Sequence, residues 1–424
     1  MTMYRSILAM RSGVCRCHAT TAQSFLTISQ VAKVMIIVLA GASFAGCMSD
    51  ISRTALPEAE VIHAHALVAP SKADPTIRIW GDEKPEWFED LIGAPPRTLK
   101  QRFPGIYGKH HAYLALSGGG QNGAYGAGLL NGWTAAGNRP EFTMVTGIST
   151  GSLIAPFAFL GPEYDDELTE VYTKYSTKDL VKKRPFLSIL AAASAADTAP
   201  LRRVIARYVD DDMIAKIAAE HRKGRRLFIG TTNLDAGRPV LWNIGAIANS
   251  PDPGAADLIH DVLLASAAIP GAFPPVLINV KADGETFDEL HVDGGTTTQV
   301  FLYPAGIDWR KVTSKLKVPG RPDVYVIRNA SLNPVYDPVK PGLIPIAGRS
   351  ISALIRTQGV GDMYRIYLGA KRDGLDYHLA LIPDEFDVKS EEPFDANYMR
   401  QLYKVGYEHG KSGKNWLSAP PGFE

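Results

Sequence analysis

Cysteine is scarce in this chain, which has only Cys15, Cys17 and Cys47 among its 424 residues. All three lie near the amino terminus, so no disulfide bond can stabilise the rest of the chain. A chain that begins at Cys47 would carry a single thiol, at its first residue. A content of 46% hydrophobic residues nevertheless provides an ample hydrophobic core.

An excess of charge of either sign is also absent. The formal net charge is +1, and 21% of the residues are charged. No global field therefore favours nucleic acid or a strongly acidic partner. The sequence also contains no nucleic-acid-binding motif and no internal repeat. We expect one large α/β domain with an amino-terminal arm, and no nucleic-acid partner, metal ion or cofactor.

One serine has the local sequence of a sharp strand-to-helix turn. Residues 147–151 are Gly-Ile-Ser-Thr-Gly, so that Ser149 lies between Gly147 and Gly151. A β-prone stretch precedes this turn, and an apolar stretch that can start a helix follows it. Such an elbow presents the hydroxyl beside a helix amino terminus, where N–H groups favour developing negative charge. The spacing alone also fits a small-residue turn, but its context favours a nucleophile.

A glycine-rich turn lies upstream, between a predicted strand at residues 113–117 and a predicted helix at residues 124–133. Residues 118–123 are Gly-Gly-Gly-Gln-Asn-Gly. Such a turn can hold a dinucleotide pyrophosphate or an oxyanion. The dinucleotide site needs an acidic residue at the end of the next strand, whereas Glu141 precedes that strand, and no lysine follows the glycines as a nucleotide-binding loop requires. An oxyanion hole fits better, because the next strand leads to Ser149.

A third motif ends in an aspartate. Residues 290–295 are Leu-His-Val-Asp-Gly-Gly, and an Asp-Gly pair is first of all a turn signal. A conventional Ser-Asp-His triad would need a histidine downstream, where His378 and His409 remain open alternatives. His378 lies in a predicted strand and His409 in a polar helix, so neither has the expected loop context. His291 could tune Asp293, but a histidine without a placed partner is expected to be an ordinary strand residue.

These motifs together resemble those of the patatin-like phospholipases, in particular their bacterial lipoprotein branch. The resemblance covers about residues 110–415. It includes residues 231–238, which resemble the mid-domain strand and turn of the family, and residues 265–275, which resemble the connection before its aspartate strand. One departure concerns the oxyanion loop, where Asn122 stands in place of the usual Arg or Lys before the last glycine.

The resemblance implies a three-layer α/β fold with a mostly parallel central sheet flanked by helices. It implies a phospholipase A-like enzyme that cleaves phospholipid or other acyl-ester substrates through an acyl-enzyme, with Ser149 as nucleophile and Asp293 as base. The remaining implied site residues are the oxyanion-hole residues Gly118, Gly119 and Gly120 and the motif glycines Gly123, Gly147, Gly151, Gly294 and Gly295. Alternatives are a lysophospholipase, a general carboxylesterase, or a non-catalytic lipid-binding envelope protein, for which Asn122 is the only hint.

The amino terminus has the pattern of an export signal. Lys33 precedes an apolar run, residues 34–46, that is too short to span a bilayer comfortably and ends in small residues. Cys47 follows at once, and Phe-Ala-Gly-Cys at residues 44–47 resembles a bacterial lipobox. The resemblance implies a lipidated Cys47, and Met48 favours anchoring in the outer membrane, facing the periplasm. The alternative is a secretory signal without lipidation.

Composition divides the chain into four segments. We expect a signal peptide at residues 1–46, a lipid-anchored and proline-rich arm at 47–110, the hydrolase domain at 111–415 and a tail at 416–424. Within the domain, predicted strands at 227–231 and 324–327 alternate with predicted helices at 201–208, 213–221, 351–367 and 398–409. Leu354 and Ile355, in the third of these helices, are expected in the core.

Overall fold

The computed structural model describes residues 52–68, 74–183, 196–332, 336, 338–414 and 416–423. The predicted signal peptide and Cys47 lie outside these residues. All the described residues belong to one compact unit, residues 50–424. In the described part of the chain, no helix is both long enough and apolar enough to cross a membrane.

A sheet of ten strands lies at the centre of this unit. Its main path runs β1 (His65–Ala66), β9 (Val276–Ala282), β10 (Glu285–Asp293), β7 (Arg226–Asn233), β4 (Met144–Ile148), β3 (Ala112–Leu116), β11 (Asp323–Arg328) and β12 (Asp376–Leu381). Strand β8 (Arg238–Asn243) also pairs with β7, and β2 (Arg78–Trp80) pairs with β8.

The sheet has a parallel half and an antiparallel half. Strands β7, β4, β3, β11 and β12 are parallel to one another, whereas β1, β2, β8, β9 and β10 join the sheet in antiparallel pairings. The short turn at Asp283 and Gly284 explains this for β9 and β10, because two residues can connect only antiparallel neighbours. The predicted central sheet flanked by helices is confirmed, and the sheet is mixed.

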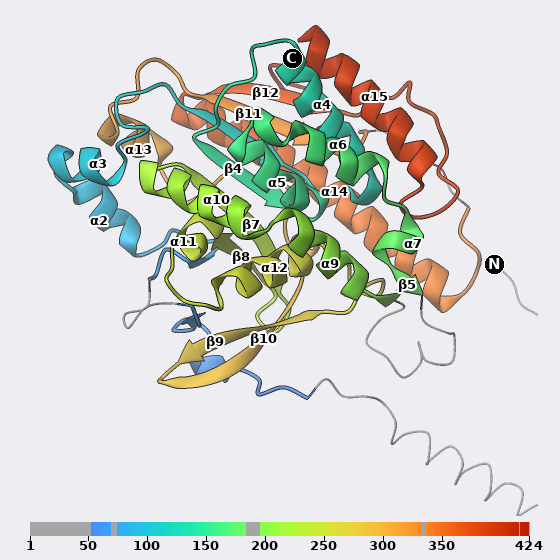
Figure 1. The fold of residues 1–424 in the computed structure, drawn as a ribbon, viewed down its shortest axis with the longest axis horizontal. Helices are drawn as coiled ribbons and strands as arrows, with labels where there is room; N and C mark the ends of the chain where they lie inside the picture. Colours follow the sequence, from blue (N-terminus) through green and yellow to red (C-terminus); the bar gives the residue numbers. More distant parts are fainter. Residues whose placement is uncertain are drawn as a thin grey trace, which may run out of the picture. The chain divides into compact units, whose positions relative to one another are not determined.

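Helices cover both faces of the sheet. On one face lie α4 (Gly123–Ala135), α5 (Thr150–Leu160), α12 (Ala255–Ser266) and α15 (Ala396–Ser412), and on the other lies α14 (Leu343–Asp373) (Figure 1). Strand β3 shows the division, because Leu114 and Leu116 pack with the first group whereas Tyr113 and Ala115 pack with α14. This alternation is what a strand buried on both faces requires.

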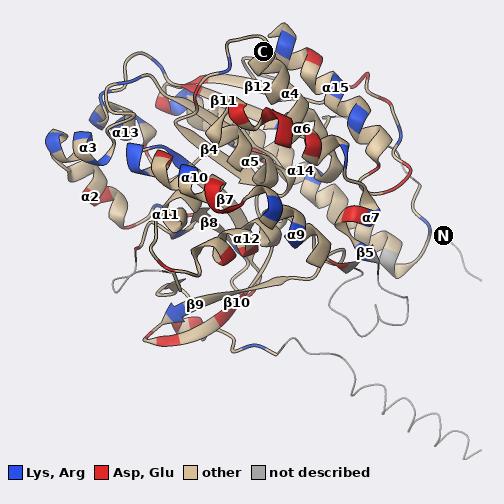
Figure 2. Cartoon of the chain, viewed as in Figure 1, with Lys and Arg blue, Asp and Glu red and all other residues tan. Residues whose placement is uncertain are grey.

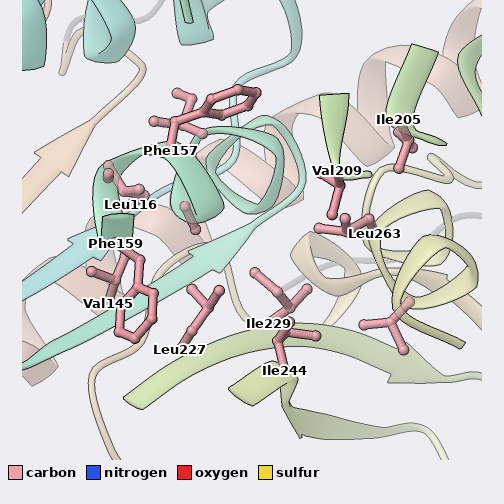
Figure 3. Packing of buried hydrophobic residues seen from close by; sticks show 14 of the residues in the cluster. Leu116, Val145, Phe157, Phe159, Ile205, Val209, Leu227, Ile229, Ile244 and Leu263 are labelled. Carbon is pink, nitrogen blue, oxygen red and sulfur yellow. The ribbon is translucent and has the colours of Figure 1, made fainter. Parts of the chain in front are cut away.

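The larger core fills the space under α5. Leu116, Val145, Leu227 and Ile229 of the parallel strands belong to one apolar cluster with side chains of the helices, among them Phe159 of α5, which lies beside Val145 (Figure 3). The remaining elements of this unit are α6 (Asp165–Thr173), α7 (Thr177–Leu180), α9 (Ala199–Tyr208), α10 (Asp211–Lys223), α11 (Ile244–Ala248), α13 (Trp309–Lys315), four short 3-10 helices and a two-stranded sheet of β5 (Lys182–Lys183) and β6 (Ala196–Asp197).

The described part of the predicted arm is integrated into the fold. Strands β1 and β2 extend the central sheet, and helices α2 (Trp87–Gly93) and α3 (Pro96–Arg102) pack against α13. The boundary that separates an arm from the domain at residue 110 therefore does not hold for these residues, because prolines can begin a helix as readily as interrupt one, and Pro96 is the first residue of α3. The predicted tail is also packed, since Leu417 pairs with Leu379 of β12.

Helix α14 is longer than predicted, and its first half is exposed. Leu354, expected in the core, is 71% exposed, and Leu343 is 86% exposed. The core instead takes residues of the second half, such as Met363 and Ile366. Apolar spacing predicted the helix correctly but could not show that it extends past the sheet.

Candidate active site

Ser149 occupies a strained elbow between β4 and α5. Its φ of 52° is unusual for a residue other than glycine. An ideal Cβ at Gly147 would lie 2.5 Å from the Gly151 carbonyl oxygen, so the turn can close only with a glycine there. The Ser149 N–H donates to Ser266 Oγ at 3.0 Å, and Ser266 Oγ donates to the Gly230 carbonyl at 2.7 Å. Ser266 therefore fixes the elbow to β7, a role that the sequence did not reveal.

The sheet itself brings the elbow and the aspartate motif together. Strand β4 runs parallel to β7 and ends with Ile148 opposite Gly230. Strand β10 runs antiparallel to β7 and ends with Asp293 opposite Thr231, the next residue. The carboxyl ends of β4 and β10 therefore meet beside neighbouring residues of β7, so that Ser149 and Asp293 lie next to each other.

Asp293 is a buried carboxyl group with two hydrogen-bond donors. Its side chain is held by the Gly295 N–H, at 2.7 Å from Oδ1, and by the Ser149 side chain. The residue is only 5% exposed. Burial raises the pKa of Asp293 to about 7, and the hydrogen bonds from Ser149 and Gly295 partly oppose this change. An acid that changes charge near neutral pH is suited to accept a proton from an alcohol.

The glycine-rich loop lies beside Ser149, but its three predicted oxyanion donors differ. The Gly118 N–H donates to the Gln299 carbonyl at 3.0 Å, so the predicted role of Gly118 as a donor does not fit this geometry. Among the described residues, the N–H groups of Gly119 and Gly120 have no hydrogen-bond acceptor. Thr150, the first residue of α5, adds an N–H that the helix leaves unpaired.

Three side chains hold this loop in place: Asn329 from outside the motif, and Gln121 and Asn122 within it. Asn329, fully buried behind β11, donates from Nδ2 to the Ser117 carbonyl at 2.9 Å and accepts the Gly126 N–H at 3.1 Å. Gln121 Oε1 accepts the Asp395 N–H at 3.0 Å. Asn122 Oδ1 accepts the Tyr398 hydroxyl at 2.8 Å. The loop is thus tied both to the sheet and to the beginning of α15.

The motif glycines allow the close packing around this site. At Gly119, an ideal Cβ would lie 2.3 Å from the Asn329 carbonyl oxygen, and Gly120 adopts a φ of 57°. A Cβ would lie between 2.1 and 2.5 Å from a neighbouring atom at each of Gly123, Gly147, Gly151, Gly294 and Gly295. Side chains at these positions would push the elbow, the loop and the aspartate turn apart.

The histidines considered as alternative bases have partners elsewhere. His378 Nε2 lies 2.9 Å from Asp323 Oδ1, and its ring stacks on Tyr325. The strand register aligns His378 of β12 with Val145 of β4, three strands away. Ser149 follows Val145 by four residues, so His378 lies roughly 13 Å from Ser149 along the strands and about 14 Å across them. His409 lies on α15, with Nδ1 at 3.2 Å from the Tyr125 hydroxyl.

His291 is fully buried in a polar network on β10. Its Nε2 lies 3.0 Å from Glu289 Oε2, and its Nδ1 lies 2.9 Å from the Thr231 hydroxyl. Glu289 in turn pairs with Arg78, at 2.7 Å. These contacts tie β10 to β7 and to β2, and they leave the Asp293 carboxylate to Ser149 and Gly295. The interpretation of His291 as a strand residue fits this geometry. In the described residues, no group of three or more His, Cys, Asp or Glu side chains could hold a metal ion.

An apolar cavity of about 80 Å³ leads away from Ser149. Ser149, Thr150 and Gly120 form its polar end. Its walls come from α5, α9, α12 and the segments beside them, and include Phe157, Ile205, Val209, Leu263 and Ala267 (Figure 3). A hydrocarbon chain attached to a carbonyl carbon at Ser149 would find apolar contacts there.

Comparisons with known proteins concern the family of the chain. No curated protein matches the chain. Among solved structures, the crystal structure of VipD from Legionella pneumophila is similar, with 11% sequence identity over 73% of this chain and 67% of that chain and a TM-score of 0.35. Residues 114–305 match the family model of the patatin-like phospholipases, and this range contains Ser149, Asp293 and the glycine-rich loop. The chain therefore contains a patatin-like phospholipase domain, at residues 114–305.

Proposed function

We propose that this chain is a serine lipid acyl hydrolase of the phospholipase A type, which uses Ser149 and Asp293 as a catalytic dyad. Membership of the domain in this family supports lipid acyl hydrolysis in general. The observation that carries the finer proposal is the hydrogen bond between the Ser149 side chain and a buried Asp293 whose pKa is raised to about 7. The two side chains can therefore exchange a proton directly, without a histidine between them.

In the acylation step, the Ser149 hydroxyl oxygen attacks the ester carbonyl carbon while Asp293 accepts the hydroxyl proton. The N–H groups of Gly119 and Gly120 are free to bind the oxyanion that forms, and the Thr150 N–H lies at the helix end beside it. One such donor contributes about 3 kcal/mol of transition-state stabilisation. When the tetrahedral intermediate collapses, the proton passes from Asp293 to the leaving alcohol, and Ser149 keeps the acyl group.

In the deacylation step, Asp293 accepts a proton from water, whose oxygen attacks the acyl-Ser149 carbonyl carbon. Collapse of this second intermediate returns the proton to the Ser149 oxygen and releases the carboxylic acid. Water and the leaving alcohol use the same base in turn. A pKa of about 7 keeps part of the Asp293 population ionised at neutral pH and makes that carboxylate a stronger base than an exposed aspartate.

Two apolar surfaces support a lipid substrate over a small dissolved ester. The first is the cavity beside Ser149, which would take the acyl chain. The second is the exposed first half of α14, with Leu343, Ile346 and Leu354 at the surface. This half leads into Gln358, whose side chain donates to the Thr297 carbonyl just after the aspartate turn. Exposed apolar side chains gathered in this way are typical of surfaces that bind another molecule or a membrane.

A fluorophosphonate probe tests the proposal directly, since it reacts with an activated serine. Wild-type protein should be modified at Ser149 and should release fatty acid from phosphatidylcholine vesicles, whereas Ser149→Ala should do neither. Hydrolysis of lysophospholipid or short esters alone would support the lysophospholipase or carboxylesterase alternatives. A protein that binds vesicles without labelling or hydrolysis would be the non-catalytic alternative and would refute the proposal.

We further propose, from the sequence alone, that the mature protein begins at a lipidated Cys47 in the bacterial cell envelope and faces the periplasm from the outer membrane. The apolar run before Cys47 and the lipobox-like residues 44–47 support this proposal. Mass spectrometry of the mature amino terminus in a bacterial host tests it. A diacylglyceryl-modified Cys47 is expected, and an unmodified mature terminus at another residue would contradict it.

A further inference from the structure

A second cavity, of about 320 Å³, opens at the other end of the strands. It is lined by Thr143 and Met144 at the start of β4 and by Arg226 at the start of β7, whereas Ser149 follows the last residue of β4. Five residues of strand separate Met144 from Ser149 along the chain, or roughly 16 Å. The two cavities share no lining residue. The second cavity is therefore separate from the proposed active site, and its volume lies in the range of about 300–1,000 Å³ typical of ligand pockets.

Most of the wall of this cavity is apolar. Helices α2, α3 and α13 close it from one side, with Phe88, Leu91, Phe103 and Leu316 among the lining side chains. Residues of the sheet, such as Phe228, line it from the other side. A hydrocarbon chain in this cavity would be surrounded by apolar side chains.

The polar part of the wall is strongly positive. Arg102, Arg222 and Arg226 line the cavity, and Asp74 is the only carboxylate among the described residues that do so. Figure 2 shows this basic region as blue segments on α3 and on the neighbouring end of α10. Two of the three arginines thus have no carboxylate counterpart in the cavity wall, which favours an anionic ligand.

Arg226 is the most unusual of these side chains. Its Nη1 donates to the carbonyls of His221 and Arg225, at 3.1 and 2.9 Å, but in the described residues no carboxylate lies within ion-pair distance of its guanidinium. Burial, followed by repulsion from Arg102, lowers the pKa of Arg226 to about 10, and attraction to Asp74 offsets this only in part. A guanidinium that stays charged in such surroundings is expected to have an anionic partner.

Further polar atoms of the residues that line this cavity lack hydrogen-bond partners. Among them, Trp87 Nε1 and His221 Nδ1 are both buried, and neither has a partner within the described chain. Burial and the nearby arginines lower the pKa of His221 to about 3, so its imidazole is neutral and adds no charge. An unpartnered indole N–H is a further donor in a cavity that already has three arginines.

We propose that this cavity is a binding site for an amphipathic anion, namely a long-chain fatty acid. Its hydrocarbon chain would lie among the apolar side chains of α2, α3 and α13, and its carboxylate would pair with Arg226, with Arg102 and Arg222 close by. The combination of one anionic head and one apolar chain satisfies the unpaired guanidinium and the apolar wall together, which neither a free anion nor a neutral hydrocarbon does. This site does not depend on hydrolysis at Ser149.

Binding is tested by titrating dodecanoate into the full chain carrying Ser149→Ala, first treated with excess short-chain ester analogue to occupy the cavity beside residue 149. Isothermal titration should show one site. Dodecanol and inorganic phosphate, each with half of the required chemistry, should bind at least tenfold more weakly. Dodecyl phosphate binding at least as tightly as dodecanoate would assign the site to phosphate-bearing lipids and overturn the fatty-acid assignment. Equal affinity for dodecanol would show an apolar cavity without anion recognition, which also overturns it.

Three substitutions in the same background locate the site. Arg226→Gln should weaken dodecanoate binding at least tenfold, and Arg203→Gln, at an exposed arginine of α9 outside the cavity, should leave it unchanged. Because Arg226 also donates to two backbone carbonyls, Leu91→Trp provides a second variant that fills the cavity and keeps the guanidinium. Both variants are checked for folding by circular dichroism. Dodecanoate binding that survives Leu91→Trp at full affinity would place the ligand elsewhere and refute the proposal.

Discussion

Asp293→Asn removes a buried carboxyl group whose pKa lies at about 7 in the folded chain, against 3.8 for an exposed aspartate. A raised pKa means that the folded state binds the proton more tightly than the unfolded state does. Below about pH 4 the carboxyl group therefore does not lower the free energy of unfolding, and it lowers that free energy increasingly as the pH rises towards 7. Asparagine has nearly the same shape and no charge, so it escapes this effect.

The magnitude follows from the two pKa values. Each pKa unit corresponds to about 1.4 kcal/mol. Asp293→Asn should therefore raise the free energy of unfolding by roughly 2 kcal/mol at pH 5, where only the unfolded chain is ionised, and by roughly 4 kcal/mol at pH 9, where both states are ionised. The same substitution should abolish ester hydrolysis at every pH. Loss of activity together with a pH-dependent gain of stability is expected only of a buried catalytic carboxylate.

Urea-induced unfolding at pH 5, 7 and 9, followed by circular dichroism, measures this difference. Ser149→Ala is the matched control, because it removes the hydroxyl that stabilises the Asp293 carboxylate. A lost hydrogen bond to a charged group costs about 1.5–3 kcal/mol, so Ser149→Ala should be less stable than the wild type at pH 9 and nearly equal to it at pH 5. If Asp293→Asn gains no stability between pH 5 and pH 9, the carboxyl group is not perturbed and the reasoning fails.

Three other outcomes are expected. The kcat/KM of the wild type on a soluble ester should rise with pH through about 7, because only ionised Asp293 accepts the Ser149 proton; a flat pH profile from 5 to 9 would contradict this role. Ala267→Leu narrows the apolar cavity beside Ser149, so the preferred acyl chain in a series of p-nitrophenyl esters should become shorter, whereas an unchanged preference would place the chain elsewhere. Tyr398→Phe removes the hydrogen bond between α15 and Asn122 and should lower kcat roughly tenfold with little change in KM. The control is Tyr403→Phe, which removes a hydroxyl of the same helix that contacts Thr169 and should leave kcat unchanged. Equal effects of the two substitutions would show that the Tyr398 contact does not position the glycine-rich loop.

Local sequence was enough to predict the two turns that the structure brings together. The elbow around Ser149 and the turn after Asp293 depend on glycines only a few residues away, so their sequences carry the geometry. The helices and strands of the domain were predicted for the same reason, since apolar spacing reports the face that each element buries. The prediction failed for the arm and for Leu354, where the deciding partner is distant in sequence.

Local sequence could not show how the parts meet. Strands β4 and β10 pair with the same edge of β7, β4 with its first half and β10 with its second half. This pairing brings Ser149 next to Asp293. No short motif encodes a register between such distant segments. Similarly, the Gly118 N–H is occupied by a carbonyl of Gln299, and Ser266 reaches the elbow from α12. Each of these contacts joins segments that are far apart in the chain.

Asn122, the only hint of a non-catalytic protein, takes part in the contacts that hold the glycine-rich loop. A cation at this position would lie at the end of the glycine-rich loop, where it could order the loop or contact the substrate. Here the Asn122 amide oxygen accepts the Tyr398 hydroxyl at 2.8 Å, and the adjacent Gln121 accepts the Asp395 N–H at 3.0 Å.

A site that had lost its function would have no reason to keep such a substitute. The two contacts hold the segment that carries Gly119 and Gly120, and the N–H groups of both remain open beside Ser149. The absence of a cation is therefore compatible with catalysis, because the hydrogen bonds to Asp395 and Tyr398 hold the loop without it.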